Sequence, residues 1–293
     1  MTGSCLAIDI GGTKIDVGVV SADGSILDRQ VIATGAHEDG DALLGEILAV
    51  AEHLRARSSE APIVCGVGCG GPMERGGSSV SPLNIPVWRS FPLADRLEQA
   101  LGIRVAVDND AKALALAEGW LGAGRDHSCF LAMVVSTGVG GGIVLDGRLL
   151  DGARGNAGHI GHLVVEPGGR RCACGVRGCL EAEASGTAIR AITGKPAADA
   201  GPADIERCGD MVGRAVASVV TLLDLGLCVV AGSVALGFGE PFFMAANRSM
   251  SRSLGLDFTA GAIIVPAGLG GDGPLLGAAK VGLDAAGTTV GPR

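Results

Sequence analysis

The sequence predicts an α/β protein with two similar domains, and three patterns support this fold class. Apolar runs of strand length alternate with amphipathic runs of helix length along the 293 residues. A strand, a glycine-rich tip, a return strand and an Asp-Gly turn occur at 5–24 and again at 129–147, as a repeat of supersecondary structure. Several later strands end in glycine turns that lead into helices. We therefore expect one such hairpin in each domain, with the two domains facing each other across a cleft.

The composition is that of a folded globular chain, and it argues against several classes of function. The chain is 47% hydrophobic and 18% charged, with 50 glycines and no tyrosine. A net charge of -8 argues against nucleic-acid binding and against binding to anionic membranes. No apolar run reaches the length of a membrane span, and the amino terminus lacks the features of a signal peptide. The odd number of cysteines, 9, indicates a reducing compartment, so we expect a cytoplasmic protein.

The first hairpin has the features of a phosphate-binding loop. Its first strand carries Asp9 near its end. Backbone N–H groups and two side chains of the tip can surround a phosphate. The tip consists of Gly11, Gly12, Thr13 and Lys14. On these residues alone an ordinary hairpin turn is the alternative. Phosphate binding is favoured because the second hairpin repeats the pattern, with Thr137 and Gly138 in its tip.

Polar residues also follow a strand of the first half, at 103–107. This strand delivers Asp108, Asn109 and Asp110 to the start of an alanine-rich helix. Such residues are either helix N-caps or ligand-binding groups, since ligands bind at strand ends in α/β sheets. A polar loop at 81–88 is either a surface turn or part of a sugar pocket.

The remaining elements are predicted from their periodicity. We expect helices at 39–57, 91–101, 111–121, 184–193 and 202–224, one that ends near 254 and one at 274–286, and strands at 62–68, 227–230 and 263–265. The strand at 227–230 is followed by Gly232 and Ser233. A glycine turn before a helix suits a nucleotide, whose anionic groups bind at helix N-termini, although plain strand–helix turns look the same.

Residues 152–186 hold the most specific pattern in the chain. Three cysteines in a C-x-C-x4-C arrangement follow two histidines, His159 and His162, and precede two carboxylates, Glu181 and Glu183. Three thiolates and one imidazole suit a closed tetrahedral zinc site. The cysteines are Cys172, Cys174 and Cys179. A disulfide fits C-x-C spacing poorly, and inert buried thiols are the remaining alternative.

Spacing alone does not decide which histidine completes the metal site, and we choose His162. When protein atoms fill all four positions, no position is left for an activated water, so the zinc would be structural. Glu181 follows the last cysteine by two residues. We expect it to act beside the metal loop or on the substrate rather than in solvent.

Together these motifs resemble those of the ROK family (repressors, open reading frames and sugar kinases), over essentially the whole chain. Residues 9–14 resemble the first phosphate motif of the family and 136–142 the second. Residues 108–110 resemble the segment with its catalytic aspartate, and 152–186 its zinc signature. The resemblance implies an actin-like, ribonuclease-H-like two-domain sugar kinase fold, with ATP in the cleft between the domains.

The resemblance also implies a domain organisation. We expect a small N-terminal α/β domain at 1–108 and a larger C-terminal domain at 109–293, with the zinc loop at 159–181. The C-terminal helix, at about 274–288, would pack back on the small domain. Relatives are commonly dimers, so we expect a homodimer that binds a small sugar and MgATP.

By the same resemblance Asp110 is the catalytic base that accepts a proton as the 6-hydroxyl of the sugar attacks the γ-phosphorus of MgATP. The residues implied to face the sugar are Gly71, Asn84, Asn109, Asp110, His159, His162 and Glu181. Those implied to hold ATP are Asp9, Gly11, Gly12, Thr13, Lys14, Thr137, Gly138, Gly232 and Ser233, with Asp9 holding Mg²⁺ through water. A structural Zn²⁺ would be bound by His162, Cys172, Cys174 and Cys179.

One position departs from the family pattern, Gly-x-Ala-Gly-Glu-x-Gly-His. His159 replaces the glutamate that contacts sugar hydroxyls. Bacterial N-acetylmannosamine kinases are similar in carrying a histidine there, whereas 81–88 and 108–120 look equally like glucokinase-type members. The preferred sugars are therefore N-acetylmannosamine and glucose.

Other functions stay open as alternatives. They are a kinase for N-acetylglucosamine, fructose or allose, and a non-catalytic sugar sensor or regulator. A ROK-type repressor is not expected, because few residues precede the first hairpin and the chain is acidic. A zinc-binding interaction module would leave both glycine hairpins unexplained.

Overall fold

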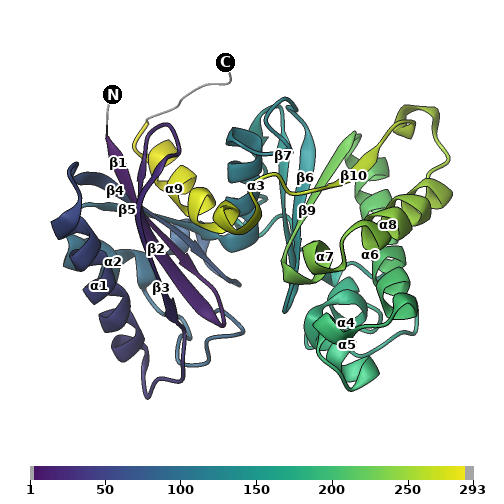
Figure 1. The fold of residues 1–293 in the computed structure, drawn as a ribbon, viewed down its shortest axis with the longest axis horizontal. Helices are drawn as coiled ribbons and strands as arrows, with labels where there is room; N and C mark the ends of the chain where they lie inside the picture. Colours follow the sequence, from purple (N-terminus) through teal and green to yellow (C-terminus); the bar gives the residue numbers. More distant parts are fainter. Residues whose placement is uncertain (1–2, 288–293) are drawn as a thin grey trace. The chain divides into compact units, whose positions relative to one another are not determined.

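Two units make up the protein in the computed structural model, which describes residues 3–287. Unit 1 contains the described residues up to Leu121, the segment Asp151–Ala157 and those from Gly271 on. Unit 2 contains Gly122–Leu150 and Gly158–Gly270. Each unit has its own five-stranded sheet (Figure 1).

The sheet of unit 1 has the strand order β3-β2-β1-β4-β5. Its strands are β1 (Ser4–Ile10), β2 (Lys14–Ser21), β3 (Ile26–Ala33), β4 (Pro62–Cys69) and β5 (Arg104–Asn109). The first three strands form an antiparallel meander, and β4 and β5 add to β1 in parallel. The carboxyl ends of β1, β4 and β5 therefore meet at one edge, where polar residues follow two of these strands.

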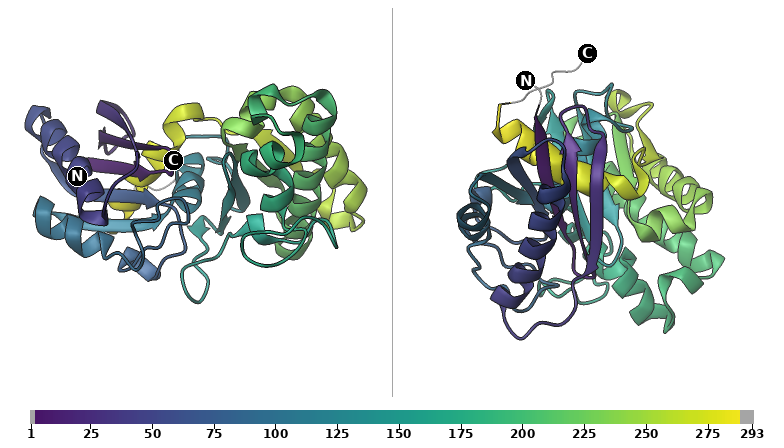
Figure 2. Two further views of the ribbon diagram at one scale, coloured as in Figure 1. Left: turned by 90° about the horizontal axis from the view of Figure 1, so that it is seen from below. Right: turned by 60° about the vertical axis from the view of Figure 1, so that its left-hand side comes forward.

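Helices cover both faces of this sheet. The helices α1 (Gly40–Arg57) and α2 (Leu93–Leu101) lie on one face, and α3 (Asp110–Trp120) and α9 (Gly273–Ala285) on the other (Figures 1 and 2). Small residues let α9 approach its neighbours closely. A Cβ on Gly66 of β4 would lie 1.9 Å from the carbonyl oxygen of Ala278, and one on Gly277 would lie 2.4 Å from that of Ala113.

This packing explains why unit 1 extends beyond residue 108, where the sequence analysis places a domain boundary. The expected boundary assigns α3 to the C-terminal domain. In the structure α3 packs against α9 and the carboxyl ends of β4 and β5, and it belongs to unit 1. Contacts between segments so distant in sequence leave no pattern in the local sequence that could predict them. The functional division into domains stays a prediction.

The sheet of unit 2 repeats this arrangement, with the order β8-β7-β6-β9-β10 matching β3-β2-β1-β4-β5. Its strands are β6 (Phe130–Val135), β7 (Val139–Leu145), β8 (Arg148–Leu149), β9 (Leu227–Ala231) and β10 (Ile263–Pro266). The first three are again antiparallel neighbours, and β9 and β10 are again parallel additions. The predicted internal repeat is confirmed.

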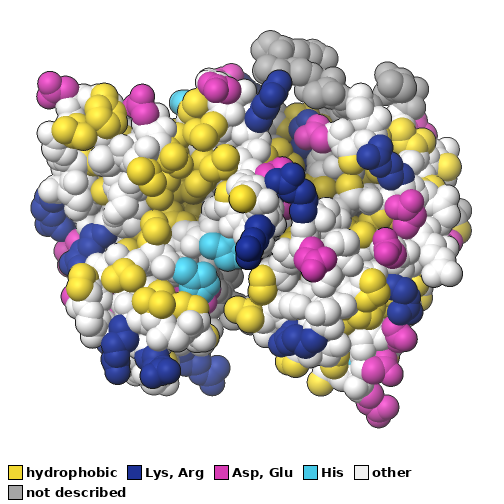
Figure 3. All heavy atoms as spheres, turned by 180° about the vertical axis from the view of Figure 1, so that it is seen from behind, with side chains coloured by type: hydrophobic (Ala, Val, Ile, Leu, Met, Phe, Trp, Pro, Cys, Tyr) yellow, Lys and Arg dark blue, Asp and Glu magenta, His cyan; other side chains and the backbone are white. Residues whose placement is uncertain are grey.

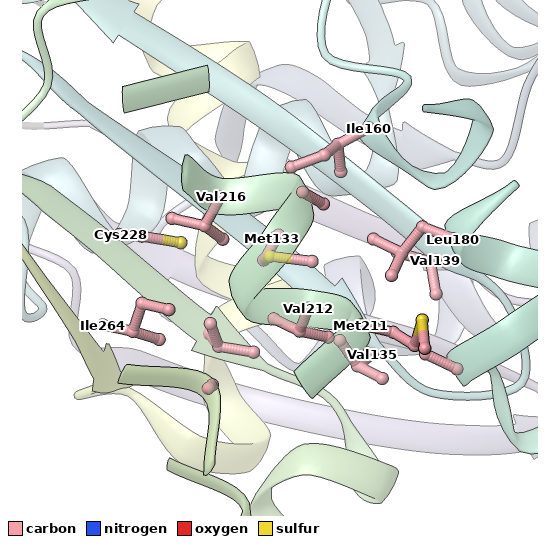
Figure 4. Close-up of a cluster of buried hydrophobic side chains, with 14 of the residues drawn as sticks. Met133, Val135, Val139, Ile160, Leu180, Met211, Val212, Val216, Cys228 and Ile264 are labelled. Carbon is pink, nitrogen blue, oxygen red and sulfur yellow. The ribbon is translucent and has the colours of Figure 1, made fainter. Parts of the chain in front are cut away.

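Five α-helices belong to the described part of unit 2: α4 (Leu180–Ala184), α5 (Gly186–Thr193), α6 (Pro202–Leu223), α7 (Ser233–Phe238) and α8 (Glu240–Ser253). The short 3-10 turns of the chain are Arg75–Gly77, Ile160–His162, Ala197–Asp199, Asp257–Thr259 and Gly270–Asp272. Side chains from β6, β9, β10 and α6 form the core of the unit (Figure 4). Gly209 and Gly213 of α6 bring that helix against α8, since a Cβ on Gly213 would lie 2.3 Å from the carbonyl oxygen of Ala246.

Two predicted helices are interrupted for local reasons. The expected helix at 184–193 breaks at Ser185, whose extended backbone and hydroxyl group cap α5 by accepting the N–H of Ala188 at 3.0 Å. The helix expected to end near 254 breaks at Gly239, which has φ 62°. Across residues 3–287 no helix has the length and apolarity of a membrane span.

Candidate functional site

The tip between β1 and β2 is an exposed turn held by its own backbone. The Gly11 N–H donates to the carbonyl of Lys14 at 3.0 Å, and the Thr34 hydroxyl donates to the carbonyl of Gly11 at 2.7 Å. Gly12 and Thr13 are exposed at the end of the turn. A Cβ on Gly12 would lie 2.4 Å from Cβ of Asn84, so the glycine permits the loop at 81–88 to pack here. The structure thus brings the predicted sugar residue Asn84 beside the predicted phosphate loop.

The same loop also contributes to the core of unit 1. Trp88 is fully buried, stacks on Phe91 with ring centroids 4.8 Å apart and donates from its indole N–H to the carbonyl of Gly40 at 3.0 Å. The loop is therefore neither a plain surface turn nor a pocket wall along its whole length. Gly71 lies between β4 and this loop, next to Pro72, whose carbonyl accepts the N–H of Ser81 at 2.9 Å.

Buried carboxylates lie behind the tip. Asp9 is only 8% exposed and pairs across the hairpin with Asp16. Burial, followed by the charges of Asp110 and Asp16, raises the pKa of Asp9 to about 7, against a smaller opposing effect of Lys14 and Arg29. A Cβ on Gly68 would lie 3.4 Å from Oδ1 of Asp9 and 3.6 Å from Cα of Asp110, so only the neighbouring strand separates these two acids.

A charged network neutralises Asp16 but not Asp9. The guanidinium of Arg29 donates from Nε to Oδ1 of Asp16 at 2.8 Å and from Nη2 to Oδ2. The same group donates from Nη1 to Asp272 at 2.6 Å, at the start of α9. Lys14 and Arg29 only partly offset the raised pKa of Asp9, so a further cation would stabilise its ionised form. Mg²⁺ at Asp9 stays a prediction.

The turn from β5 to α3 is fixed by its own polar side chains. Asn109, rather than a carboxylate, is the N-cap, and its Oδ1 accepts the N–H groups of Ala111 at 3.1 Å and Lys112 at 3.3 Å. Oδ1 of Asp108 accepts the Asn109 N–H at 2.7 Å. Asp110 is the first residue of α3, where the positive end of the helix favours an ionised carboxylate.

The equivalent tip in unit 2 is polar but carries no carboxylate of its own. Oε2 of Glu181 accepts the N–H of Val139 at 3.0 Å, and a Cβ on Gly138 would lie 2.9 Å from the same oxygen. The hydroxyl of Thr187 donates to the carbonyl of Thr137 at 2.9 Å. Glu181 therefore connects the metal loop to the second hairpin, a contact that the sequence analysis did not anticipate.

The glycine turn after β9 lies beside this tip. The hydroxyl groups of Ser136 and Ser233 are 3.0 Å apart. Gly232 has φ 101°, and a Cβ there would lie 2.3 Å from the carbonyl oxygen of Val135. Unit 2 thus brings Thr137, Gly138 and the Gly232–Ser233 turn together, and anion binding there stays a prediction.

The cysteine-rich loop gathers four candidate metal ligands. Ligand atoms of His162, Cys172, Cys174 and Cys179 all lie within 4.8 Å of one another. Nδ1 of His162 is 3.7 Å from Sγ of Cys172, and Sγ of Cys174 is 3.6 Å from Sγ of Cys179. A tetrahedral zinc ion with Zn–S bonds of about 2.3 Å spaces its ligands about 3.8 Å apart, so the donor set fits zinc.

Both the chemistry and the neighbours of this cluster agree with a cation. Burial, together with the neighbouring thiols of Cys174 and Cys172, raises the pKa of Cys179 to about 12, so this thiol needs a cation to be a thiolate at neutral pH. His159 is not part of the cluster. Its ring is exposed and stacks near His162, with centroids 6.3 Å apart, and histidine side chains are visible at the surface in Figure 3.

A buried glutamate anchors the metal loop to the helices of unit 2. Glu183 has no exposed side-chain surface, and its carboxylate accepts the N–H of Arg170 and Nη1 of Arg170, both at 2.6 Å. Arg207 of α6 donates to the same carboxylate and to the backbone carbonyl of Glu183. Burial opposes ionisation, but the hydrogen bonds and charge of Arg170 and the charge of Arg207 lower the pKa of Glu183. In the sequence Glu183 stands out only as a carboxylate after the cysteines.

Comparison with known proteins places these features in one family. The model of the ROK family matches residues 5–284. A glucokinase of Thermotoga maritima is 44% identical over 191 residues, which are 63% of this chain and 58% of that protein. An N-acetylmannosamine kinase of Escherichia fergusonii is 37% identical over 252 residues, or 80% of this chain and 84% of that protein. A crystal structure of a ROK family glucokinase from Streptomyces griseus in complex with glucose and AMPPNP has a TM-score of 0.84 and 30% identity, covering 96% of this chain and 100% of that one.

Proposed function

The chain belongs to the ROK family, and from this premise we propose that it is an ATP-dependent sugar kinase. It would transfer the γ-phosphoryl group of ATP to the 6-hydroxyl of an aldohexose or N-acetylhexosamine. The observation that carries the proposal lies in unit 1. There the carboxylate of Asp9 and the backbone of Asp110 both lie beside Gly68 of β4, and the hairpin tip after β1 is exposed.

Asp110 is the proposed catalytic base. Phosphoryl transfer depends mostly on positioning and on charge neutralisation, and one carboxylate near the attacking hydroxyl is enough to accept its proton. The place of Asp110 at the start of α3 supports the ionised form that this role requires. Asn109, whose side chain caps the same helix, and Asn84, which packs on the hairpin tip, are proposed to bind the sugar together with Gly71.

The two glycine hairpins are proposed to bind the phosphates of ATP. In unit 1 the groups are the tip N–H donor of Gly12, with Thr13 and Lys14, whereas the N–H of Gly11 donates to the carbonyl of Lys14 and Gly11 shapes the tip. In unit 2 they are Thr137, Gly138 and the Gly232–Ser233 turn. Mg²⁺ would shield the phosphate charge, and Asp9 is proposed to hold it through water. The raised pKa of Asp9, about 7, supports a cation there, because a cation would favour its ionised form.

Zinc is proposed as a structural ion held by His162, Cys172, Cys174 and Cys179. It would supply rigidity to the loop without an open position for chemistry. His162 and Glu181 are then proposed to face the sugar, along with His159. Oε2 of Glu181 already accepts the Val139 N–H, so its other oxygen is the one available to a sugar hydroxyl.

N-acetylmannosamine and glucose are the proposed sugars, because relatives named for each are similar to this chain. We also propose a homodimer, which light scattering on the purified protein would test. The test of function is an ADP-release assay with MgATP and glucose, N-acetylmannosamine, N-acetylglucosamine, mannose, fructose or allose. One strong responder supports the proposal. Absence of turnover with all six sugars, in protein that contains zinc and binds a sugar, would favour a non-catalytic sensor.

A further inference from the structure

A buried lysine lies two residues after the proposed catalytic base. Lys112 of α3 is 2% exposed. Its ammonium contacts Oδ1 of Asp108 and Oδ1 of Asp151, both at 2.8 Å, and the carbonyl oxygen of Gly155 at 3.4 Å. An ammonium group has three N–H donors, so these partners use its full capacity. Burying a charge is costly unless it is paired, and Lys112 is paired with two carboxylates.

One of these carboxylates belongs to the turn that carries Asp110. Asp108 accepts the N–H of Asn109 as well as the ammonium of Lys112. Burial raises the pKa of Asp108, and the hydrogen bond and charge of Lys112 oppose that effect. The pair Asp108–Lys112 therefore spans the turn from strand to helix and fixes the residues between them.

The other two partners belong to the segment Asp151–Ala157, which is part of unit 1 although the residues on either side of it belong to unit 2. Arg75 donates to the carbonyl of Gly152 at 2.9 Å, and the side-chain amide of Asn156 donates to the carbonyl of Met73 at 3.2 Å. Within residues 3–287, the ammonium of Lys112 is the side-chain cation that pairs with Asp151. His159, a proposed sugar ligand, lies two residues after the end of this segment.

We propose that Lys112 is a positioning residue of the sugar site, which fixes the Asn109–Asp110 turn and the segment 151–157 with one ammonium group. The proposal rests on the proposed kinase function. Lys112 does not touch the sugar. Its loss would let the turn and the segment move independently, so the sugar would be bound in a wider range of positions and the attacking hydroxyl would be aligned less often.

The test compares two variants, one that changes Lys112 and one that changes its partner Asp151. Lys112→Met removes the ammonium and leaves two unpaired carboxylates. Asp151→Asn keeps the side-chain shape and removes the charge of one partner, which weakens its contact with Lys112. Asp151 is 53% exposed, so this variant should fold. We expect the sugar KM to rise by about tenfold in Lys112→Met and by about threefold in Asp151→Asn, with the ATP KM within about twofold of the wild type. Hydrogen exchange of residues 151–157 should quicken in both.

The matched controls are Lys280→Met and Asp284→Asn, which break an ion pair on α9 of the same unit. Neither should change the sugar KM or the exchange of 151–157. A fall in melting temperature of Lys112→Met and Asp151→Asn without a change in sugar KM would overturn the proposal, as would unchanged exchange of 151–157. If the wild type phosphorylates none of the sugars, the proposed function fails, whereas the exchange of 151–157 still reports whether Lys112 holds that segment. Should Lys112→Met fail to fold, Asp151→Asn decides by the same two readouts.

Discussion

The two hairpins occupy equivalent places in sheets of the same topology, yet their chemistry differs. In unit 1 the pair of residues next to the closing pair of the hairpin consists of Asp9 and Asp16. In unit 2 the equivalent pair consists of Val134 and Gly140. Both hairpins end in a turn with backbone N–H groups. Only the hairpin of unit 1 has buried carboxylates, Asp9 and Asp16, behind its turn. We infer that the acids needed for phosphoryl transfer lie in unit 1, and that unit 2 contributes binding groups and the metal loop.

The largest expected effect comes from the acid at the start of α3. In Asp110→Asn, turnover should fall by about 10³-fold, because an amide cannot accept the hydroxyl proton, while sugar affinity should change little. Turnover is measured by ADP release and sugar affinity by calorimetry.

The matched control is Asp95→Asn, an exposed acid in the first turn of α2. It also lies in the first turn of a helix but is not preceded by a strand that ends in acids, and it should retain wild-type turnover. Near-normal turnover of Asp110→Asn would remove the base assignment and with it the division of roles between the two units.

Loss of the metal from its loop should weaken sugar binding more than it slows phosphoryl transfer. In Cys174→Ala, zinc and sugar affinity should be lost together, with the sugar KM raised by at least about tenfold, because three remaining ligands hold zinc weakly and the loop carries His162 and Glu181. Zinc content is measured by elemental analysis. Cys129→Ala, in the same unit but outside the cluster, is the control and should retain zinc. Full zinc content in Cys174→Ala would refute the ligand set.

A smaller effect on zinc binding is expected for Glu183, which anchors the metal loop without binding the metal. Glu183→Gln keeps the size of the side chain but removes the buried carboxylate that pairs with the partly exposed Arg170 and Arg207, a loss of about 1–2 kcal/mol after screening by solvent. Zinc release to a coloured chelator should quicken by about tenfold, since the anchored loop opens more often. Glu206→Gln, which breaks an exposed pair with Arg248, should release zinc at the wild-type rate. Equal rates for the two variants would show that Glu183 does not hold the loop.

What the sequence predicts well is what local patterns encode. The repeated strand, glycine tip and strand predicts both hairpins, and the spacing of the three cysteines predicts the ligands that the structure gathers. The long-range partners are not predicted. Nothing near Lys112 indicates that an alanine-rich helix buries this lysine against Asp151, 39 residues later. Likewise, Arg207 lies 24 residues after Glu183, and only the packing of α6 on the metal loop brings the two together.

The last expected effect is on stability rather than on turnover or binding, and it concerns the acid that distinguishes the first hairpin. The pKa of Asp9 is raised from 3.8 to about 7 in the folded chain. Between these values the folded state binds more protons than the unfolded state, so this group lowers stability as the pH rises through that window. Without Mg²⁺, Asp9→Asn should therefore be more stable than the wild type at pH 8, by up to about 4 kcal/mol, and the difference should vanish near pH 4.

Thermal unfolding at pH 4, 6 and 8, with and without Mg²⁺, measures this difference. Added Mg²⁺ should stabilise the wild type at pH 8 and have much less effect on Asp9→Asn, because a bound cation favours the ionised carboxylate. Asp126→Asn, an exposed acid of unit 2 paired with Arg125, should follow the wild type at every pH. If Asp9→Asn also follows the wild type, Asp9 is not a perturbed acid, and the first hairpin loses the feature that sets it apart from the second.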